Sequence, residues 1–267
     1  MPDKNIKIIF LGDISGYLGR QGVKTIVPLW QKKYQPDLFI ANIENLAHNK
    51  GVTPKTLKEI YDTGVRLYSG GNHIWKKYDL GQLAEESDYQ IACPANDSRA
   101  PKKYRYQVVE VKGVKVALIN LNGRTFMNEE GLENPFFKIE EILQEIPEQS
   151  IVILDIHAEA TSEKRAMGFY LDGRVSAVLG THTHVPTADA QILEKGTAYL
   201  TDIGMIGAYD SILGIKKEII IEKFLTEEKI IHDLPKSGQI EINAVLLEID
   251  KETKKATKIK NLREIIN

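Results

Sequence analysis

The chain has 267 residues, of which 42% are hydrophobic, enough to fill the core of one large domain or two small ones. Its 35 basic and 37 acidic residues are interspersed and give a net charge of −2, which argues against bulk nucleic acid as a partner but does not exclude a single nucleotide. The single cysteine, Cys93, excludes an intramolecular disulfide. The sequence shows neither a signal peptide nor an apolar run of the ~20 residues that a membrane helix needs. We therefore expect a cytoplasmic protein without membrane contact.

The first third of the chain alternates buried strands with helices. Apolar runs predict strands at residues 6–11, 38–41 and 65–69, and helical periodicity predicts helices at 21–33 and 53–62. Each strand is followed by polar residues: Asp13, then Glu44 with Asn45, then Asn72 with His73. Because ligands of open α/β sheets bind beyond the carboxyl ends of the strands, these residues are candidates for a site.

The rest of the chain adds further strands, helices and two hairpins. Strands are predicted at residues 104–111, 114–121, 150–156, 175–179 and 197–201, and helices at 136–146 and around 163–165. Lys112-Gly113 joins one hairpin, residues 241–249 and 256–262 form another at a sheet edge, and 216–225 fits a helix or a strand. We therefore expect one α/β domain, residues 1–267, with two packed mixed β-sheets flanked by helices.

Two histidines follow the apolar run 175–179. His182 and His184 lie two residues apart, just after Gly180. Side chains alternate along an extended segment, so both imidazoles are expected to project from one side of a loop. Imidazole is the commonest side-chain ligand of transition metals, and the pair therefore predicts half of a metal site.

The other half is expected among the polar residues that follow strand ends. The complete set is Asp13, Glu44, Asn45, Asn72, His73, His157, His182 and His184. Carboxylate, amide oxygen and imidazole without thiolate suit Fe, Mn or Zn and argue against a cysteine-rich structural zinc site. Six or seven ligands are too many for one ion but suit two ions that share a bridging carboxylate. Such a pair can clamp a phosphate and hold the hydroxide that attacks it.

The order of these motifs resembles the calcineurin-like metallophosphoesterases, and more closely their YmdB-like branch, whose members act on 2′,3′-cyclic nucleotides. The branch features extend along nearly the whole chain: Gly12-Asp13-Ile14-Ser15-Gly16 with Gly19-Arg20, Ala41-Asn42-Ile43-Glu44-Asn45, Ser69-Gly70-Gly71-Asn72-His73-Ile74-Trp75, Asn122-Gly123-Arg124, Gly180-Thr181-His182-Thr183-His184 and Thr201-Asp202-Ile203-Gly204-Met205. The resemblance implies a four-layer αββα sandwich.

Three positions depart from the general superfamily pattern. The usual Asp-x-His is Asp13-Ile14-Ser15, the usual bridging aspartate is Glu44, and the usual Asn-His-Glu is Asn72-His73-Ile74. These departures recur in the YmdB-like branch. They strengthen the resemblance to that branch and argue against copying a ligand map from ordinary phosphatases.

The resemblance implies how the ligands divide between two ions. Asp13, Glu44, Asn45 and His184 would hold one ion, while Glu44, Asn72, His157 and His182 would hold the other. Glu44 would bridge them, and Asn45 would take the place left by the histidine missing at Ser15. The family implies two iron ions, with manganese able to occupy such sites.

The same resemblance implies that His73 is a general acid. A hydroxide held between the two ions would attack phosphorus, and His73 would protonate the departing 2′-oxygen, leaving a 3′-nucleotide. Arg124 would bind phosphate or base, or form an ordinary salt bridge. His48 and His232 fit no pattern and are expected at the surface.

Two alternative functions stay open. The same chemistry could act on another phosphoester: a 3′,5′-cyclic nucleotide, a monoester or an RNA end. The chain could instead be a metal-binding regulatory protein with little catalysis, although the presence of His73 argues against this, since a structural site needs no proton donor. The edge hairpin at the C-terminus and the resemblance also allow a homo-oligomer.

Overall fold

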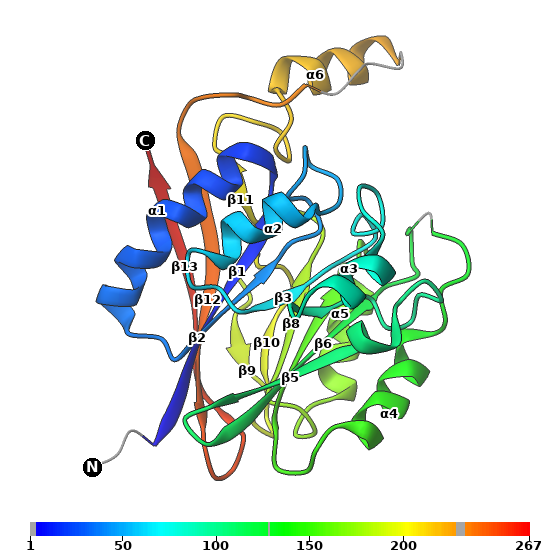
Figure 1. Ribbon diagram of the computed structural model, residues 1–267, viewed down its shortest axis with the longest axis vertical. Helices are drawn as coiled ribbons and strands as arrows, with labels where there is room; N and C mark the ends of the chain where they lie inside the picture. Colours follow the sequence, from blue (N-terminus) through cyan, green and yellow to red (C-terminus); the bar gives the residue numbers. More distant parts are fainter. Residues whose placement is uncertain (1–3, 128, 228–232) are drawn as a thin grey trace.

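The computed structural model describes residues 4–127, 129–227 and 233–267, so His232 lies outside the described residues. Two mixed sheets contain all the long strands (Figure 1). The first sheet has the order β13 (Ala256–Ile266), β12 (Ile240–Asp250), β11 (Met205–Ala208), β1 (Asn5–Ile14), β2 (Leu38–Asn42), β3 (Leu67–Ser69) and β4 (Gln90–Ala92). The second has the order β5 (Tyr106–Val111), β6 (Val114–Asn122), β7 (Ile151–His157), β8 (Ala177–Thr181), β10 (Ala198–Leu200) and β9 (Gln191–Ile192).

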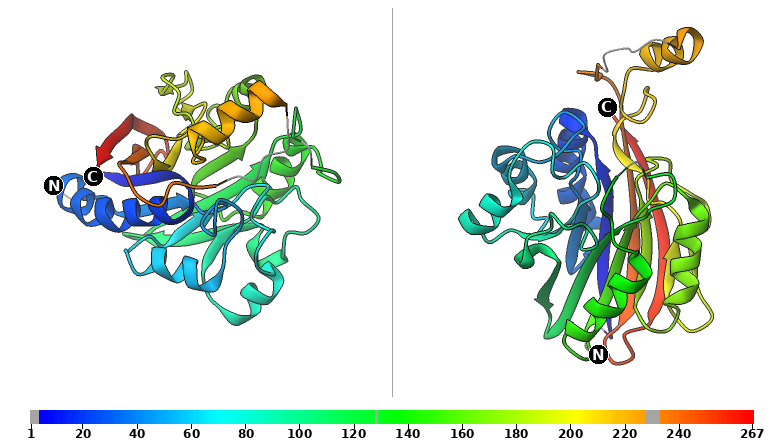
Figure 2. Two further views of the ribbon diagram at one scale, coloured as in Figure 1. Left: turned by 90° about the horizontal axis from the view of Figure 1, so that it is seen from above. Right: turned by 90° about the vertical axis from the view of Figure 1, so that its right-hand side faces the viewer.

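Helices cover the outer face of each sheet, as the right-hand view of Figure 2 shows. The first sheet carries α1 (Gly16–Tyr34), α2 (Pro54–Tyr61) and α3 (Leu80–Glu86), and the second carries α4 (Pro135–Glu145) and α5 (Thr161–Tyr170). A short 3-10 helix spans Lys102–Tyr104. The predicted αββα sandwich is therefore confirmed. Among the described residues, no helix combines the length and hydropathy that crossing a bilayer requires.

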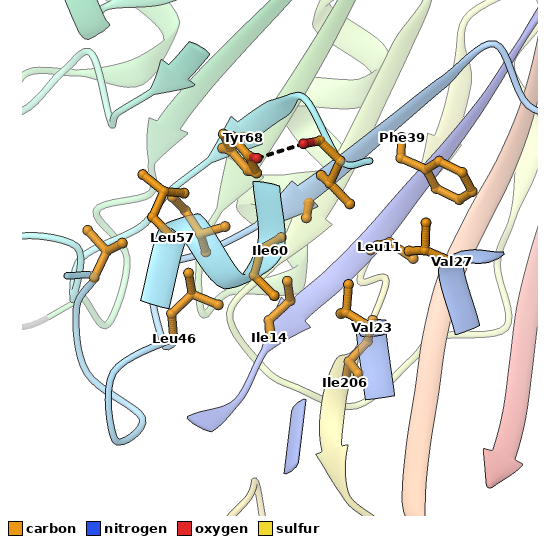
Figure 3. Close-up of a cluster of buried hydrophobic side chains, with 14 of the residues drawn as sticks. Leu11, Ile14, Val23, Val27, Phe39, Leu46, Leu57, Ile60, Tyr68 and Ile206 are labelled. Carbon is orange, nitrogen blue, oxygen red and sulfur yellow. Dashed lines mark hydrogen bonds between the residues drawn. The ribbon is translucent and has the colours of Figure 1, made fainter. Parts of the chain in front are cut away.

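Three hydrophobic cores separate the four layers. Successive residues of β1 alternate between two of them: Ile9 and Leu11 face the helices, while Ile8 and Phe10 face the second sheet. Figure 3 shows the core beneath α1 and α2, where the Tyr68 hydroxyl donates to the carbonyl oxygen of Val65. Because both faces of β1 are buried over most of its length, residues 6–11 appear in the sequence as an apolar run that only Lys7 interrupts.

The carboxyl ends of the parallel strands meet at one end of the sandwich. Asp13 of β1 is in register with Asn42 of β2, and His157 of β7 is in register with Thr181 of β8. The sequence predicted polar residues near these ends, but β1, which was predicted to end at Leu11, continues to Ile14 and includes Asp13. The sequence did not predict α3, β4, β9 or β11, which are short and carry little periodic signal.

An arm leaves the sandwich between β11 and β12. We define the arm as the described residues 209–227 and 233–239; it contains α6 (Lys217–Thr226), which stands away from the sheets in Figures 1 and 2. The segment that fitted a helix or a strand is thus a helix. Both hairpins predicted from the sequence, β5 with β6 and β12 with β13, are confirmed, and β13 is an edge strand.

Candidate metal centre and substrate cavity

One group of predicted ligands surrounds His157, the last residue of β7. Its Nε2 lies 3.1 Å from Asn72 Oδ1, 3.0 Å from His182 Nδ1 and 3.3 Å from Glu44 Oε2. The ligand atoms of Glu44, His157 and His182 all lie within 4.8 Å of one another. Burial lowers the pKa of both imidazoles, and that of His157 falls well below its usual value, so both are neutral, which is the form that binds metals.

The chemistry of this first group fits a cation. His182 Nε2 lies 3.2 Å from a carboxylate oxygen of Glu159 and therefore carries the ring proton, which leaves a lone pair on Nδ1. Asn72 Oδ1 and Glu44 Oε2 offer only lone pairs. Acceptors facing one another at hydrogen-bond distance, with no proton between them, form a site for a metal ion.

The second group surrounds Asn45. Its Nδ2 lies 3.0 Å from Asp13 Oδ1, 2.9 Å from Glu44 Oε1 and 3.3 Å from His184 Nε2, while His184 Nε2 is 3.2 Å from Asp13 Oδ2. Asn45 therefore turns its nitrogen inward, and to act as a ligand its amide must turn by half a rotation and present Oδ1. Burial alone would lower the pKa of His184, but the charges of Asp13 and Glu44 outweigh it and raise the pKa to about 9.

Glu44 lies between the two groups. Its Oε1 faces Asn45, and its Oε2 faces His157 and accepts the backbone N–H of His73 at 2.8 Å. Gly71 makes room for this arrangement, because a Cβ there would lie 2.2 Å from Glu44 Oε2 and 2.5 Å from His157 Nε2. The Glu44 side chain is 1% exposed, so both of its oxygens are confined to these contacts.

The loop with the two histidines differs from the prediction. His182 has a φ of 103° and His184 a φ of 64°, so the segment is not extended and the two imidazoles do not project from one side. His182 contacts His157, whereas His184 contacts Asp13. Left-handed backbone at two non-glycine residues is costly and clusters at functional sites.

A buried ion pair that the sequence did not indicate holds this loop. Lys164 Nζ lies 2.7 Å from Asp202 Oδ2, and the side chains are 0% and 1% exposed. The same oxygen accepts the N–H of Thr183 at 3.1 Å and its hydroxyl at 2.8 Å. Lys164 stands within the charged run 163–165 and looked like a solvent-facing helix residue, so no sequence signal could have found it.

A second buried acid was also missed. Asp155 is 0% exposed in β7, and burial raises its pKa to about 7, although hydrogen bonds from Thr181 and Asn42 act in the opposite direction. A signal that Asp155 is buried was available, because it is the one acidic residue inside an otherwise apolar run.

A cavity of about 1060 Å³ opens over both groups of ligands. Three basic residues, Arg20, Lys50 and Lys236, line it together with His73. The arm supplies an apolar wall made of Leu213, Ile215, Leu234 and Pro235. His48 is exposed, as expected for a surface residue, and it also lines this cavity.

His73 is held beside both groups. Its Nδ1 lies 3.0 Å from Asn45 Oδ1 and 3.4 Å from Glu44 Oε1, and the hydrogen bond with Glu44 raises its pKa. Both of these contacts are made by Nδ1, so neither occupies Nε2 of His73. The side chain is 30% exposed.

The structure does not bring Arg124 to the ligands. Arg124 lines a separate cavity of about 340 Å³ with Asn134, Phe136 and Glu163, and it is absent from the described lining of the large cavity. Its backbone N–H donates to the Glu163 carboxylate at 3.0 Å. Its substrate-binding role stays a prediction. Arg20, which belongs to the branch feature Gly19-Arg20 but received no role from the sequence, lies in the large cavity.

Comparison with known proteins places the chain in a family. The model of the family described as YmdB-like protein matches residues 9–262. The 2′,3′-cyclic-nucleotide 2′-phosphodiesterase of Bacillus subtilis (strain 168) is 42% identical over 258 residues, 96% of each chain. A putative phosphatase/phosphodiesterase of Mycoplasma pneumoniae is 36% identical and covers 97% of this chain and 93% of that one.

Solved structures agree with this placement. A hypothetical protein from Thermus thermophilus superposes with a TM-score of 0.89 at 35% identity, over 98% of this chain and 100% of that chain. A novel phosphatase from Mycoplasma pneumoniae has a TM-score of 0.90 at 34% identity, over 98% and 94%. From its sequence motifs, its sandwich of two sheets and these relatives, the chain belongs to the YmdB-like family of metallophosphoesterases.

Proposed function

We propose that the chain is a dimetal phosphodiesterase that hydrolyses 2′,3′-cyclic nucleotides to 3′-nucleotides. The observation that carries the proposal is the pair of ligand groups that meet at Glu44 beneath a cavity lined by basic residues. The name of the Bacillus subtilis relative supports this substrate class. A cavity of about 1060 Å³ is large enough for a mononucleotide.

The two ligand groups support a division of the residues between two ions. Asp13, Asn45 and His184 would hold one ion, Asn72, His157 and His182 the other, and Glu44 would bind both through its two oxygens. Bound ions would supply Lewis-acid polarisation of the phosphate and a nucleophile at neutral pH. Imidazole, carboxylate and amide ligands suit Fe, Mn or Zn, and the family resemblance favours iron, with manganese as the alternative. Elemental analysis of protein purified without oxygen decides between them.

The residues of the chain would perform the remaining steps. Arg20, Lys50 and Lys236 would attract the anionic phosphate into the cavity. As water adds to phosphorus, the bond from phosphorus to O2′ breaks, and Nε2 of His73 donates its proton to O2′. The contact between Nδ1 and Glu44 Oε1 orients the imidazole for this transfer.

Replacing His73 by alanine should lower kcat for 2′,3′-cAMP by about 10²–10⁴-fold, the usual contribution of a general acid. Metal content should not change, because His73 is assigned no metal. On bis(p-nitrophenyl) phosphate the loss should be small, since p-nitrophenolate leaves without taking a proton. Equal losses on both substrates would show that His73 does not act as the acid.

We further propose that the apolar wall of the arm contacts the nucleobase. Ile215→Ala with Leu234→Ala should raise KM for 2′,3′-cAMP by about 30-fold, because burying apolar surface contributes on the order of 1 kcal/mol for each of the two partly buried side chains. KM for ribose 2,3-cyclic phosphate, which lacks a base, should stay the same. Leu225→Ala is the matched control, since this leucine of α6 is 80% exposed and does not line the cavity. An equal change in KM for both substrates would contradict base contact.

A second candidate is the same hydrolysis of other phosphoesters. The Mycoplasma pneumoniae relative is named a putative phosphatase/phosphodiesterase, which covers a wider range of phosphoesters. Comparing kcat/KM for 2′,3′-cAMP, 3′,5′-cAMP and 3′-AMP distinguishes these substrates. If Glu44→Gln and His73→Ala turned over substrate like the parent, the proposed mechanism would be wrong. If the metal-loaded parent hydrolysed none of these substrates, the remaining candidate would be a metal-binding regulatory protein.

A further inference from the structure

We propose that Thr181 and Asp155 are positioning residues that fix the tautomer of His157 and so keep a lone pair on its Nε2. The inference rests on the proposed metal site and goes beyond it, because neither residue is a ligand. Thr181 Oγ1 lies 2.7 Å from Asp155 Oδ1 and 2.9 Å from His157 Nδ1, and all three side chains are 0% exposed.

The direction of the hydrogen bonds follows from the single proton of the hydroxyl. The Thr181 hydroxyl donates to the Asp155 carboxylate, which in its ionised form accepts only. The hydroxyl oxygen then has lone pairs left to face His157, so Nδ1 must be the donor of the contact at 2.9 Å. A neutral imidazole has one N–H, and with that proton on Nδ1 the Nε2 atom is a free ligand.

A backbone group fixes the other end of this chain of hydrogen bonds. The N–H of Glu44 can only donate, and it lies 3.1 Å from Asn42 Oδ1. The Asn42 amide therefore turns its nitrogen the other way, where it donates to the Gly70 carbonyl and, at 3.1 Å, to Asp155 Oδ2. Asp155 thus accepts at both oxygens.

The opposite tautomer would leave two buried acceptor oxygens facing each other without a proton between them. If His157 carried its proton on Nε2, the Thr181 hydroxyl would have to donate to Nδ1. Asp155 Oδ1 would then face a lone pair of Thr181 Oγ1 at 2.7 Å, and the full burial of both side chains makes such an unmade hydrogen bond costly. Outer partners of metal-binding histidines commonly fix ring orientation and tautomer in this way.

The placement of the three residues follows from strand geometry. Asp155 and His157 lie two apart on β7 and so project from the same face of the sheet, and Thr181 is the register partner of His157 on β8. Asn42 comes from β2 of the first sheet. The series of hydrogen bonds therefore crosses the interface between the two sheets. It links the packing of the sheets to the orientation of His157.

The direct test is ¹⁵N NMR of the histidine rings in the metal-free protein, with His157 assigned through a His157→Gln variant. The pH is kept well above 7, so that the Asp155 carboxyl, whose pKa burial raises to about 7, is ionised. The parent should show the proton of His157 on Nδ1, and Thr181→Val should show it wholly or partly on Nε2. This result does not depend on any activity, so it is separate from the test of the proposed function. A proton on Nε2 in the parent would overturn the inference.

Metal affinity gives the second readout, with Mn²⁺ as the probe in equilibrium dialysis. Thr181→Val should weaken the tighter binding of Mn²⁺ by about 10–100-fold, as losses of outer partners usually do. Thr181→Ser keeps the hydroxyl and should restore both affinity and tautomer. Thr197→Val is the matched control, because Thr197 is also a buried hydroxyl, bonded to the carbonyl of Val175 away from the ligands. Equal losses in Thr181→Val and Thr197→Val, or none in either, would overturn the inference.

Discussion

Glu44→Gln should release the bound metal and lower kcat/KM for 2′,3′-cAMP by about 10³-fold or more. Glu44 is the one side chain that contacts both ligand groups among the described residues, with Oε1 2.9 Å from Asn45 Nδ2 and Oε2 3.3 Å from His157 Nε2. Glutamine keeps the size but replaces one oxygen by an NH₂ group, which cannot bind a cation. Lewis-acid stabilisation contributes several kcal/mol, and each 1.36 kcal/mol is about tenfold in rate.

Metal content by mass spectrometry and hydrolysis of 2′,3′-cAMP measure this effect together. Glu140→Gln makes the same chemical change on α4, where Glu140 pairs with Arg174 on the surface, and it should keep both metal and rate. If Glu44→Gln retained two ions per chain and the parent rate, the bridging role of Glu44 would be wrong. Loss of one ion only would assign Glu44 to a single ion and contradict it as well.

Much of the fold could be predicted because strands that are buried on both faces appear in the sequence as apolar runs. β1, β2 and β7 are covered on both faces, so their apolar runs stand out, and polar residues such as Asp13 and His157 mark where they end. β11 and β9 could not be predicted, because strands of four and two residues have no measurable period.

The candidate site could also be predicted in part: which residues come together was predictable, but their orientation was not. The predicted ligands lie together because parallel strands bring their carboxyl ends to one edge. The direction of each side chain was beyond the sequence, since it depends on loop dihedrals such as the φ of 103° at His182. The roles of Asp155 and Lys164 could not be assigned either, because their partners, Thr181 and Asp202, are distant in the chain.

Lys164→Met should destabilise the metal-free protein by about 3–5 kcal/mol, which corresponds to a fall in Tm of about 10 °C. Methionine is similar in length, but it leaves the Asp202 carboxylate, 1% exposed, without a cation. Asp202 would still accept the N–H groups of Thr183 and Gly204, so the variant should fold and the loss should reflect the buried charge. Urea unfolding of metal-free protein measures the effect without any contribution from released metal.

Lys138→Met is the matched control for this variant. Lys138 is 9% exposed on α4, but its partners Glu133 and Glu141 are 56% and 53% exposed, so water replaces the lost cation and the cost should be at most about 1 kcal/mol. Lys164→Met with Asp202→Asn removes both charges and should recover part of the stability. Because Asp202 also anchors Thr183 between His182 and His184, Lys164→Met should weaken Mn²⁺ binding, whereas Lys138→Met should not. Equal stability of the two single variants would show that the buried pair contributes no more than a surface one.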